Sequence, residues 1–259
     1  MAKLDGADPG TVAWVDLQTP DLDTVRKFYG ELLGWSFAGA DNANAGFYVM
    51  AQLGGRNVAG MVKLSSESRF PPMWSVYIAT ESADAIATKV REAGGKIVMP
   101  PMDVMDQGTM AYFADPTGAY FGVWQGNRHK GAQVVAEPGA MTFHEVYTRD
   151  ATKARAFYAS VFGLESKRLD EPNIEYWTLS KGTKTAFGVM QMSDQFGKDV
   201  PSHWNTYFAV TDVDASAKTV TSLGGQVAAP PFDTPYGRIA VVVDPLGAAF
   251  CLMTPTAVV

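Results

Sequence analysis

The chain has few residues with which to cross-link itself or to hold a metal ion. Its 259 residues include one cysteine, Cys251, and three histidines. A single cysteine excludes an internal disulfide and suits a reducing compartment. The histidines, His129, His144 and His203, stand far apart in the sequence, without the close spacing typical of metal sites. We therefore expect neither a disulfide framework nor a histidine-rich metal centre.

Basic residues and long apolar runs are also scarce. The chain carries 21 Lys and Arg against 27 Asp and Glu, a net charge of -6, and shows no basic stripe, so we expect no nucleic-acid partner. One local arginine could still bind an anionic substrate. No run approaches the ~20 apolar residues of a membrane span, and residues 1–12 lack the apolar centre of a signal peptide. We expect a cytoplasmic protein with no membrane partner.

What the chain does contain is a long internal repeat. Residues 14–35, WVDLQTPDLDTVRKFYGELLGW, return in altered form at residues 143–164, FHEVYTRDATKARAFYASVFGL. The Phe157-Tyr158 pair follows Phe28-Tyr29 by 129 positions (157 − 28 = 129). A shared period of this length indicates a duplicated unit.

Local patterns predict the elements of each repeat. Residues 12–18 alternate between two environments, as a strand does. Asp21 is a suitable N-cap for a helix with apolar residues at helical spacing, and Gly34 ends it. Residues 46–53 and 58–64 predict a hairpin around Gly54-Gly55, with the turn type left open. The pattern then restarts with a strand at 74–79, a helix at 83–93, and strands at 96–100, 109–114 and 119–125.

The predicted fold class is α+β, in two similar domains. We place the first domain at residues 1–125, a polar linker at 126–140 and the second domain at 141–259. Strands with one apolar face need helices to cover that face, which becomes the convex side of a curved sheet. The concave inner face is then the natural ligand cleft.

Four motifs carry a resemblance to a known family: FYGELLGW, WSVYIAT, EAGGKIVMPP and FADPTGAYFGVWQ. They resemble the vicinal oxygen chelate superfamily, which includes glyoxalase I, bleomycin-resistance proteins and extradiol dioxygenases, and the resemblance covers nearly the whole chain twice. The tandem arrangement is similar to two-domain glyoxalase-like proteins of the actinobacterial and mycobacterial type. The resemblance implies two βαβββ units per domain, forming a half-barrel sheet. Because two fused domains imitate the homodimer of single-domain relatives, we expect a monomer or a loose homodimer.

The catalytic members of that family bind a divalent metal through histidine and glutamate side chains on the inner face. The positions that correspond by motif spacing are Trp14, Ser75, Gly122, Phe143, Asn205 and Cys251. Tryptophan, phenylalanine and glycine offer no donor atom, whereas a catalytic ion normally keeps about three protein ligands. We therefore predict no metal and no cofactor. A slip of one residue in the strand would turn His144 into the cleft, and that alternative stays open.

The predicted inner face has an aromatic residue followed two positions later by a carboxylate in both halves. Asp16 and Glu145 are the candidate catalytic residues, because burial among rings raises a carboxyl pKa towards that of a general base. A structural hydrogen bond or salt bridge is the alternative. Rings on this face could stack on a planar ligand or simply fill a core. The candidate ligand-binding residues are Trp14, Gln18, Tyr48 (or Phe47), Ser75, Tyr77, Tyr112, Trp124, Phe143, Tyr147, Asn205, Tyr207 and Cys251.

Three functions fit these residues. The favoured one is a cytoplasmic, glyoxalase-like protein that binds a small, partly aromatic organic molecule in a metal-free cleft, with the more aromatic first half as the working site. The second is a metal-independent isomerase or lyase with Asp16 or Glu145 as general base. The third is a metal-dependent enzyme of the lactoylglutathione-lyase type. We expect His129 and His203 to lie at the surface or as caps, and Cys251 to be a small apolar filler as readily as a ligand contact.

Overall fold

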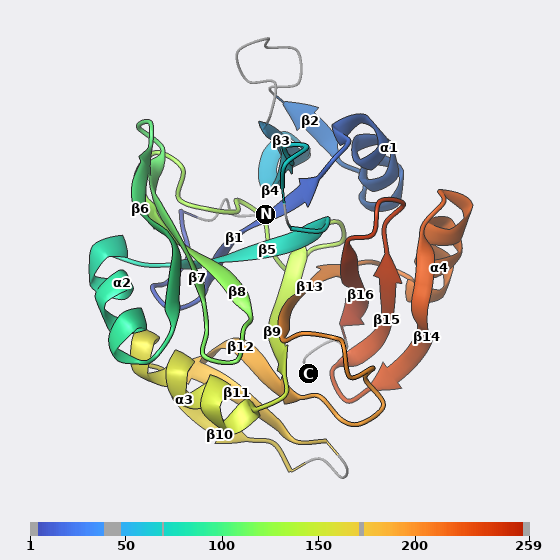
Figure 1. Ribbon diagram of the computed structural model, residues 1–259. Helices are drawn as coiled ribbons and strands as arrows, with labels where there is room; N and C mark the ends of the chain where they lie inside the picture. Colours follow the sequence, from blue (N-terminus) through green and yellow to red (C-terminus); the bar gives the residue numbers. More distant parts are fainter. Residues whose placement is uncertain (1–4, 39–47, 69, 171–173, 256–259) are drawn as a thin grey trace.

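Two eight-stranded mixed sheets and four helices make up the described part of the chain. The computed structural model describes residues 5–38, 48–68, 70–170 and 174–255 (Figure 1). The strand orders are β2-β3-β4-β1-β5-β8-β7-β6 and β10-β11-β12-β9-β13-β16-β15-β14. Neither sheet is closed into a barrel, and the second order repeats the first strand for strand, which confirms the predicted duplication. Within these residues no helix is both long and apolar enough to cross a membrane.

The observed elements follow the predicted pattern in both halves. The first half contains β1 Val12–Thr19, α1 Leu22–Leu33, β2 Ser36–Ala38, β3 Tyr48–Leu53, β4 Arg56–Lys63, β5 Met73–Ala79, α2 Ala83–Glu92, β6 Lys96–Val104, β7 Gly108–Ala114 and β8 Tyr120–Gly126. The second half contains β9 Met141–Thr148, α3 Ala151–Phe162, β10 Glu165–Arg168, β11 Tyr176–Lys181, β12 Lys184–Gln191, β13 His203–Ala209, α4 Val213–Ser222, β14 Gln226–Thr234, β15 Gly237–Val243 and β16 Ala249–Pro255.

Two boundaries differ from the prediction. Strand β6 continues through Pro100-Pro101 to Val104, well past the predicted end at residue 100. The strand lies at the outer edge of its sheet, where a proline without an N–H removes no ladder bond. The short strand β2 was not predicted, and residues 46–47 of the predicted hairpin, Phe47 included, lie outside the described residues.

The turn chemistry follows from the sequence. The Asp21 carboxylate accepts a hydrogen bond from the Asp23 amide at 3.1 Å, and Gly34 ends the helix at φ 72°. Gly54 and Gly55 have φ values of 57° and 76°. Positive φ at both central residues defines a type I′ hairpin, which answers the question that the sequence left open.

The two halves share a single hydrophobic core. Helix α1 lies beside α4, and α2 lies beside α3 (Figure 1). The Trp74 indole donates to the Tyr29 hydroxyl at 3.0 Å, and that hydroxyl donates to Asp244 of the other half at 3.2 Å. The equivalent bonds start in the second half: the Trp204 indole donates to the Tyr158 hydroxyl, which donates to Asp115 of the first half. Buried hydrogen bonds thus join the halves on both sides of a pseudo-twofold.

Candidate functional site

On the inner face of the first sheet, several side chains surround one carboxylate, that of Asp16. Along β1, Val15 and Leu17 pack into the shared core, while Asp16 projects from the opposite face. Its Oδ1 atom accepts hydrogen bonds from the Trp14 indole at 2.8 Å and from the Tyr48 hydroxyl at 2.7 Å. The structure therefore brings together residues that the sequence placed on a common face, including one from β3.

Burial sets the protonation of Asp16. The side chain is 8% exposed, and burial raises its pKa to about 6, opposed by the hydrogen bonds from Tyr48, Trp14 and Tyr77. No salt bridge among the described residues joins this carboxylate to a basic side chain. Asp16 is therefore a carboxyl group that exchanges its proton close to neutral pH.

A second hydrogen-bond chain lies beside Asp16. The Gln18 amide donates to Ser75 Oγ at 2.9 Å, and Ser75 Oγ lies 2.8 Å from the Tyr112 hydroxyl. Tyr112 and Tyr77 are tilted rings with centroids 6.2 Å apart. The face thus combines polar groups with aromatic surface, which is the usual composition of a small-molecule site.

The second half repeats the cluster with glutamate. Tyr207 donates a hydrogen bond to Glu145 Oε1, and its hydroxyl lies 3.3 Å from that of Tyr147. Tyr176 also bonds to Glu145, whose pKa is raised by burial and lowered in part by these tyrosines. The sequence prediction missed Tyr176, although its place on β11 corresponds to that of Tyr48 on β3.

Other predicted residues surround Glu145. Asn205 stands opposite it across the β9–β13 ladder, and Phe143 packs against Tyr207 with ring centroids 5.9 Å apart. Cys251 is fully buried in a small apolar cluster with Tyr207, and burial raises its thiol pKa well above the usual range. A thiol in this state packs as an apolar group and does not act as a nucleophile.

Two strand glycines make room for the carboxylates, and the sequence prediction missed both. Gly60 faces Asp16 in the parallel β1–β4 pair, and Gly188 faces Glu145 in the β9–β12 pair. A Cβ atom at Gly60 would lie 2.1 Å from both Asp16 Oδ1 and the Tyr48 hydroxyl. A glycine inside a strand pattern is a signal of close approach that could have identified these positions.

The Gly60→Ala variant should change the titration of Asp16. The added methyl group displaces the Tyr48 hydroxyl, and losing one donor raises the carboxyl pKa by about one unit. A pH titration of carboxyl-labelled aspartate by 13C NMR measures the change. Gly197→Ala is the matched control, because its Cβ would meet no atom closer than 3.8 Å. An unchanged Asp16 pKa in folded Gly60→Ala protein would contradict the contact.

The histidines occupy three different environments. His144 is 5% exposed and lies on the helix-packed side of β9, opposite Thr206 across the ladder and out of the cleft. His203 is half-buried, with its ring 5.5 Å from that of Tyr147. His129 is also half-buried: its ring lies edge-on against Trp14 with centroids 4.3 Å apart, and burial lowers its pKa to about 4.

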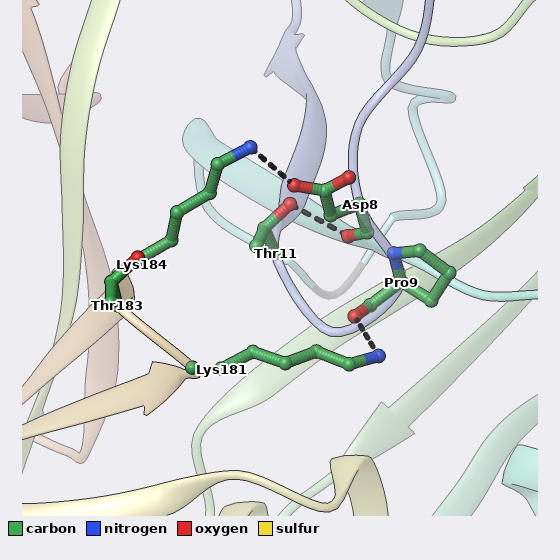
Figure 2. Close-up of a pocket in the computed structure, with 7 residues that line it drawn as sticks. Asp8, Pro9, Thr11, Lys181, Thr183 and Lys184 are labelled. Atoms are coloured by element: carbon green, nitrogen blue, oxygen red, sulfur yellow. Dashed lines mark hydrogen bonds and ion pairs between the residues drawn. The ribbon is translucent and has the colours of Figure 1, made fainter.

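A surface hollow lies away from both clusters. Figure 2 shows Lys184 reaching Asp8 at 2.7 Å and Lys181 donating to the Pro9 carbonyl at 3.0 Å. These contacts join the segment before β1 to the β11–β12 hairpin of the other half. The hollow therefore belongs to the junction of the halves, and its residues do not take part in the carboxylate clusters.

Comparison with known proteins places the chain in a family. The sequence profile of the Glyoxalase/Bleomycin resistance protein/Dioxygenase superfamily matches residues 11–123, and that of a Glyoxalase-like domain matches residues 140–253. The chain belongs to the vicinal oxygen chelate superfamily. It is 41% identical to "Putative glyoxylase CFP32" of Mycobacterium tuberculosis, with 98% of each chain covered. It is 34% identical to "Anthracycline biosynthesis protein DnrV" of Streptomyces peucetius, covering 95% of this chain and 93% of the other.

Solved structures of the superfamily share the fold. A Mn(II)-bound glyoxalase from Novosphingobium aromaticivorans superposes with a TM-score of 0.68 at 16% identity, covering 95% of this chain and 82% of that one. A catechol 2,3-dioxygenase gives 0.64 at 11% identity, covering 98% and 91%. At such identities the likeness concerns the fold alone.

The donor atoms on the inner faces do not fit the divalent ion of the metal-dependent members. Among the described residues, no three His, Cys, Asp or Glu side chains lie close enough to share an ion. The first-half cluster offers one carboxylate, whose Oδ1 atom already accepts two hydrogen bonds. In the second cluster the carboxylate Glu145 accompanies Asn205 and the fully buried Cys251. A catalytic ion needs about three protein ligands, so neither cluster fits one.

Proposed function

We propose that this glyoxalase-like protein binds a small, partly aromatic organic molecule in a metal-free cleft. The observation that carries the proposal is a carboxylate bonded to tyrosine, present in both halves at equivalent places. Within the part of the chain that the structure describes, neither carboxylate has a basic partner or belongs to a metal-ligand set. A relative named for anthracycline biosynthesis makes fused-ring aromatic compounds reasonable ligands to test.

The energetic cost of these carboxylates supports a role in binding. At pH 8 a buried Asp16 with a pKa of about 6 disfavours folding by about 3 kcal/mol relative to an ordinary carboxyl. The cost is absent below the ordinary aspartate pKa and develops as the pH rises through about 6. Groups that lower stability and hold perturbed pKa values concentrate at functional sites.

Native mass spectrometry of the chain purified from its own host tests the proposal. The expected spectrum shows a small organic molecule bound to a monomer or a loose homodimer. The molecule should dissociate from the protein chemically unchanged. The Asp16→Asn, Glu145→Gln double variant should lose that molecule, while Glu92→Gln, an exposed carboxylate on α2, should keep it. Stoichiometric zinc, nickel, iron or manganese by elemental analysis would overturn the metal-free assignment.

A metal-independent isomerase or lyase is the second candidate, favoured by the pKa of Asp16 near 6. A general base works best when its pKa lies near the operating pH. In this reading Asp16 or Glu145 removes a proton from carbon, and the reaction rate follows a bell-shaped pH profile. Loss of that profile in Asp16→Asn would support the enzyme over the binding protein.

The proposal includes a cytoplasmic location, which the single cysteine favours.

A further inference from the structure

The predicted clefts, on the inner faces of the two sheets, differ in how other segments cover them. In the first half, the linker after β8 runs over the cleft face. The Trp124 indole donates to the His129 carbonyl at 2.6 Å, and the His129 ring lies against both Trp14 and Trp124. Trp14 is left 3% exposed and Trp124 8%. Side chains of the protein itself therefore occupy the place where a planar ligand would stack.

Backbone hydrogen bonds hold this cover in place. The Asn127 amide donates to the Gln107 carbonyl at 2.9 Å, and the Ala132 amide donates to the Ala13 carbonyl of β1 at 2.8 Å. A salt bridge of 2.8 Å joins Arg128 to Asp106. Opening the first cleft would break several bonds at once, which makes it the more costly cleft to fill.

In the second half, the corresponding ring is accessible. Phe143, Tyr147 and Tyr176 are each partly exposed. The floor beneath them is a small apolar cluster separate from the shared core, formed by Tyr207, Ile239, Cys251 and Met253 with Phe143 and Val241 beside it. On the neighbouring β14–β15 hairpin, Phe232 is 45% exposed and Tyr236 53%. Among the described residues, apolar surface is thus available to a ligand here.

The charge of this cleft selects among planar ligands. Glu145 is 4% exposed and forms no salt bridge among the described residues. Its hydrogen-bonding partners are tyrosines, whose ring faces carry negative potential. An organic cation is attracted both to a carboxylate and to aromatic faces, by about 0.5–2 kcal/mol per ring contact. An anion would meet only repulsion and the cost of desolvation.

We propose that the second-half cleft is the ligand site and that it takes a planar organic cation, with its charge against Glu145 and its rings against the partly exposed Phe143 and Tyr147. The inference rests on the proposed function and names the half and the ligand class. Gly188 leaves room for this arrangement, because a Cβ there would lie 1.9 Å from the Tyr176 hydroxyl that bonds to Glu145.

Binding of the cation should strengthen as the pH rises. A cation favours the ionised form of Glu145, and burial keeps the pKa of that carboxyl raised in the free protein. The titratable groups that face Glu145 are Tyr147 on its own strand, Tyr176 on β11, Tyr207 on β13 and Cys251 on β16, and burial raises the pKa of each. They stay neutral between pH 5.5 and 8, as does His203 above pH 7, since burial lowers its pKa.

Three tricyclic probes of similar shape test the proposal by fluorescence titration of the full chain. They are 9-aminoacridine, a cation, acridone, which is neutral, and anthracene-9-carboxylate, an anion. We expect 9-aminoacridine to bind at least about tenfold more tightly than acridone, and the anion to bind most weakly. Glu145→Gln should remove the preference for the cation, whereas Glu175→Gln, an exposed carboxylate near β11, should preserve it.

The outcomes separate this inference from the proposed function. If Glu145→Gln fails to fold, the pH dependence of the parent chain decides: the affinity for 9-aminoacridine must rise from pH 5.5 to 8 while that for acridone stays level. Equal or tighter binding of acridone or the anion would overturn the inference and leave the binding function standing. A preference that depends on Asp16 and not on Glu145 would place the site in the first half. Failure of all three probes to bind would overturn the inference, while native mass spectrometry of the chain from its own host would still decide the binding function.

Discussion

A chain carrying His144→Val together with Thr206→Val should withstand acid far better than the parent. His144 Nδ1 and Thr206 Oγ1 are buried and find no hydrogen-bond partner among the described residues. The two residues face each other across the β9–β13 ladder. The corresponding positions of the first half hold Val15 and Val76, both fully buried. The second half therefore carries two polar groups where its counterpart shows that valine fits.

The acid effect follows from the pKa of His144. Burial lowers it from 6.5 to about 3, so between these values the unfolded chain binds a proton that the folded chain does not. Above pH 6.5 His144 does not lower the free energy of unfolding of the parent chain. As the pH drops below 6.5 this free energy falls by about 1.4 kcal/mol per pH unit, reaching a loss of about 3 kcal/mol at pH 4. At pH 7.5 the gain is about 1–3 kcal/mol, from removing unpaired polar atoms.

Urea unfolding at pH 7.5 and pH 4 measures both effects. Thr206→Val alone is the control, because it removes one unpaired atom and leaves the titrating ring in place. The free energy of unfolding of the double variant should exceed that of the control by a larger margin at pH 4 than at pH 7.5. An equal margin at the two pH values would show that His144 is not held neutral in the folded protein. His129 also titrates, but it is present in every chain compared.

The fold could be predicted from the sequence because the same pattern of strands and helices occurs in both halves of the chain. Alternation in residues 12–18 placed Asp16 opposite Val15 and Leu17, and the same spacing did so for Glu145. The strand period of two is a local property of the sequence, so it can be recognised without knowing which elements pack against the strand. For the same reason His144 was placed on the helix-packed side in the favoured register, as the structure shows.

Features that depend on distant segments could not be predicted in this way. The position of His129 over Trp14 depends on the path of the linker, which has no periodic pattern. Tyr176 bonds to Glu145 from β11, which is separated from β9 by β12, so the contact depends on how the whole sheet is assembled. The aromatic residues of the first half favoured it as the working cleft, but the composition of a face does not reveal whether another segment covers it.

Tyr158→Phe should destabilise the chain by about 2–4 kcal/mol, because its hydroxyl links the two halves. It accepts a hydrogen bond from the Trp204 indole at 3.0 Å and donates one to Asp115 Oδ2 at 2.9 Å. Tyr158, Trp204 and Asp115 are respectively 0%, 7% and 3% exposed, so water cannot replace the lost hydroxyl. An unsatisfied buried group costs about 1–3 kcal/mol, and more when it is charged.

The position of Asp115 makes the effect larger than a single lost bond. Its Oδ1 atom accepts from the Thr117 amide at 2.7 Å and from the Ala119 amide at 3.1 Å, which fixes the turn before β8. Tyr158 therefore holds a turn of the first half from a helix of the second, and the two halves should unfold together. Equilibrium urea unfolding measures the loss in free energy of unfolding. Tyr120→Phe is the control, because Tyr120 is 36% exposed. A Tyr158→Phe chain as stable as this control, or parent halves that unfold in separate transitions, would contradict the coupling.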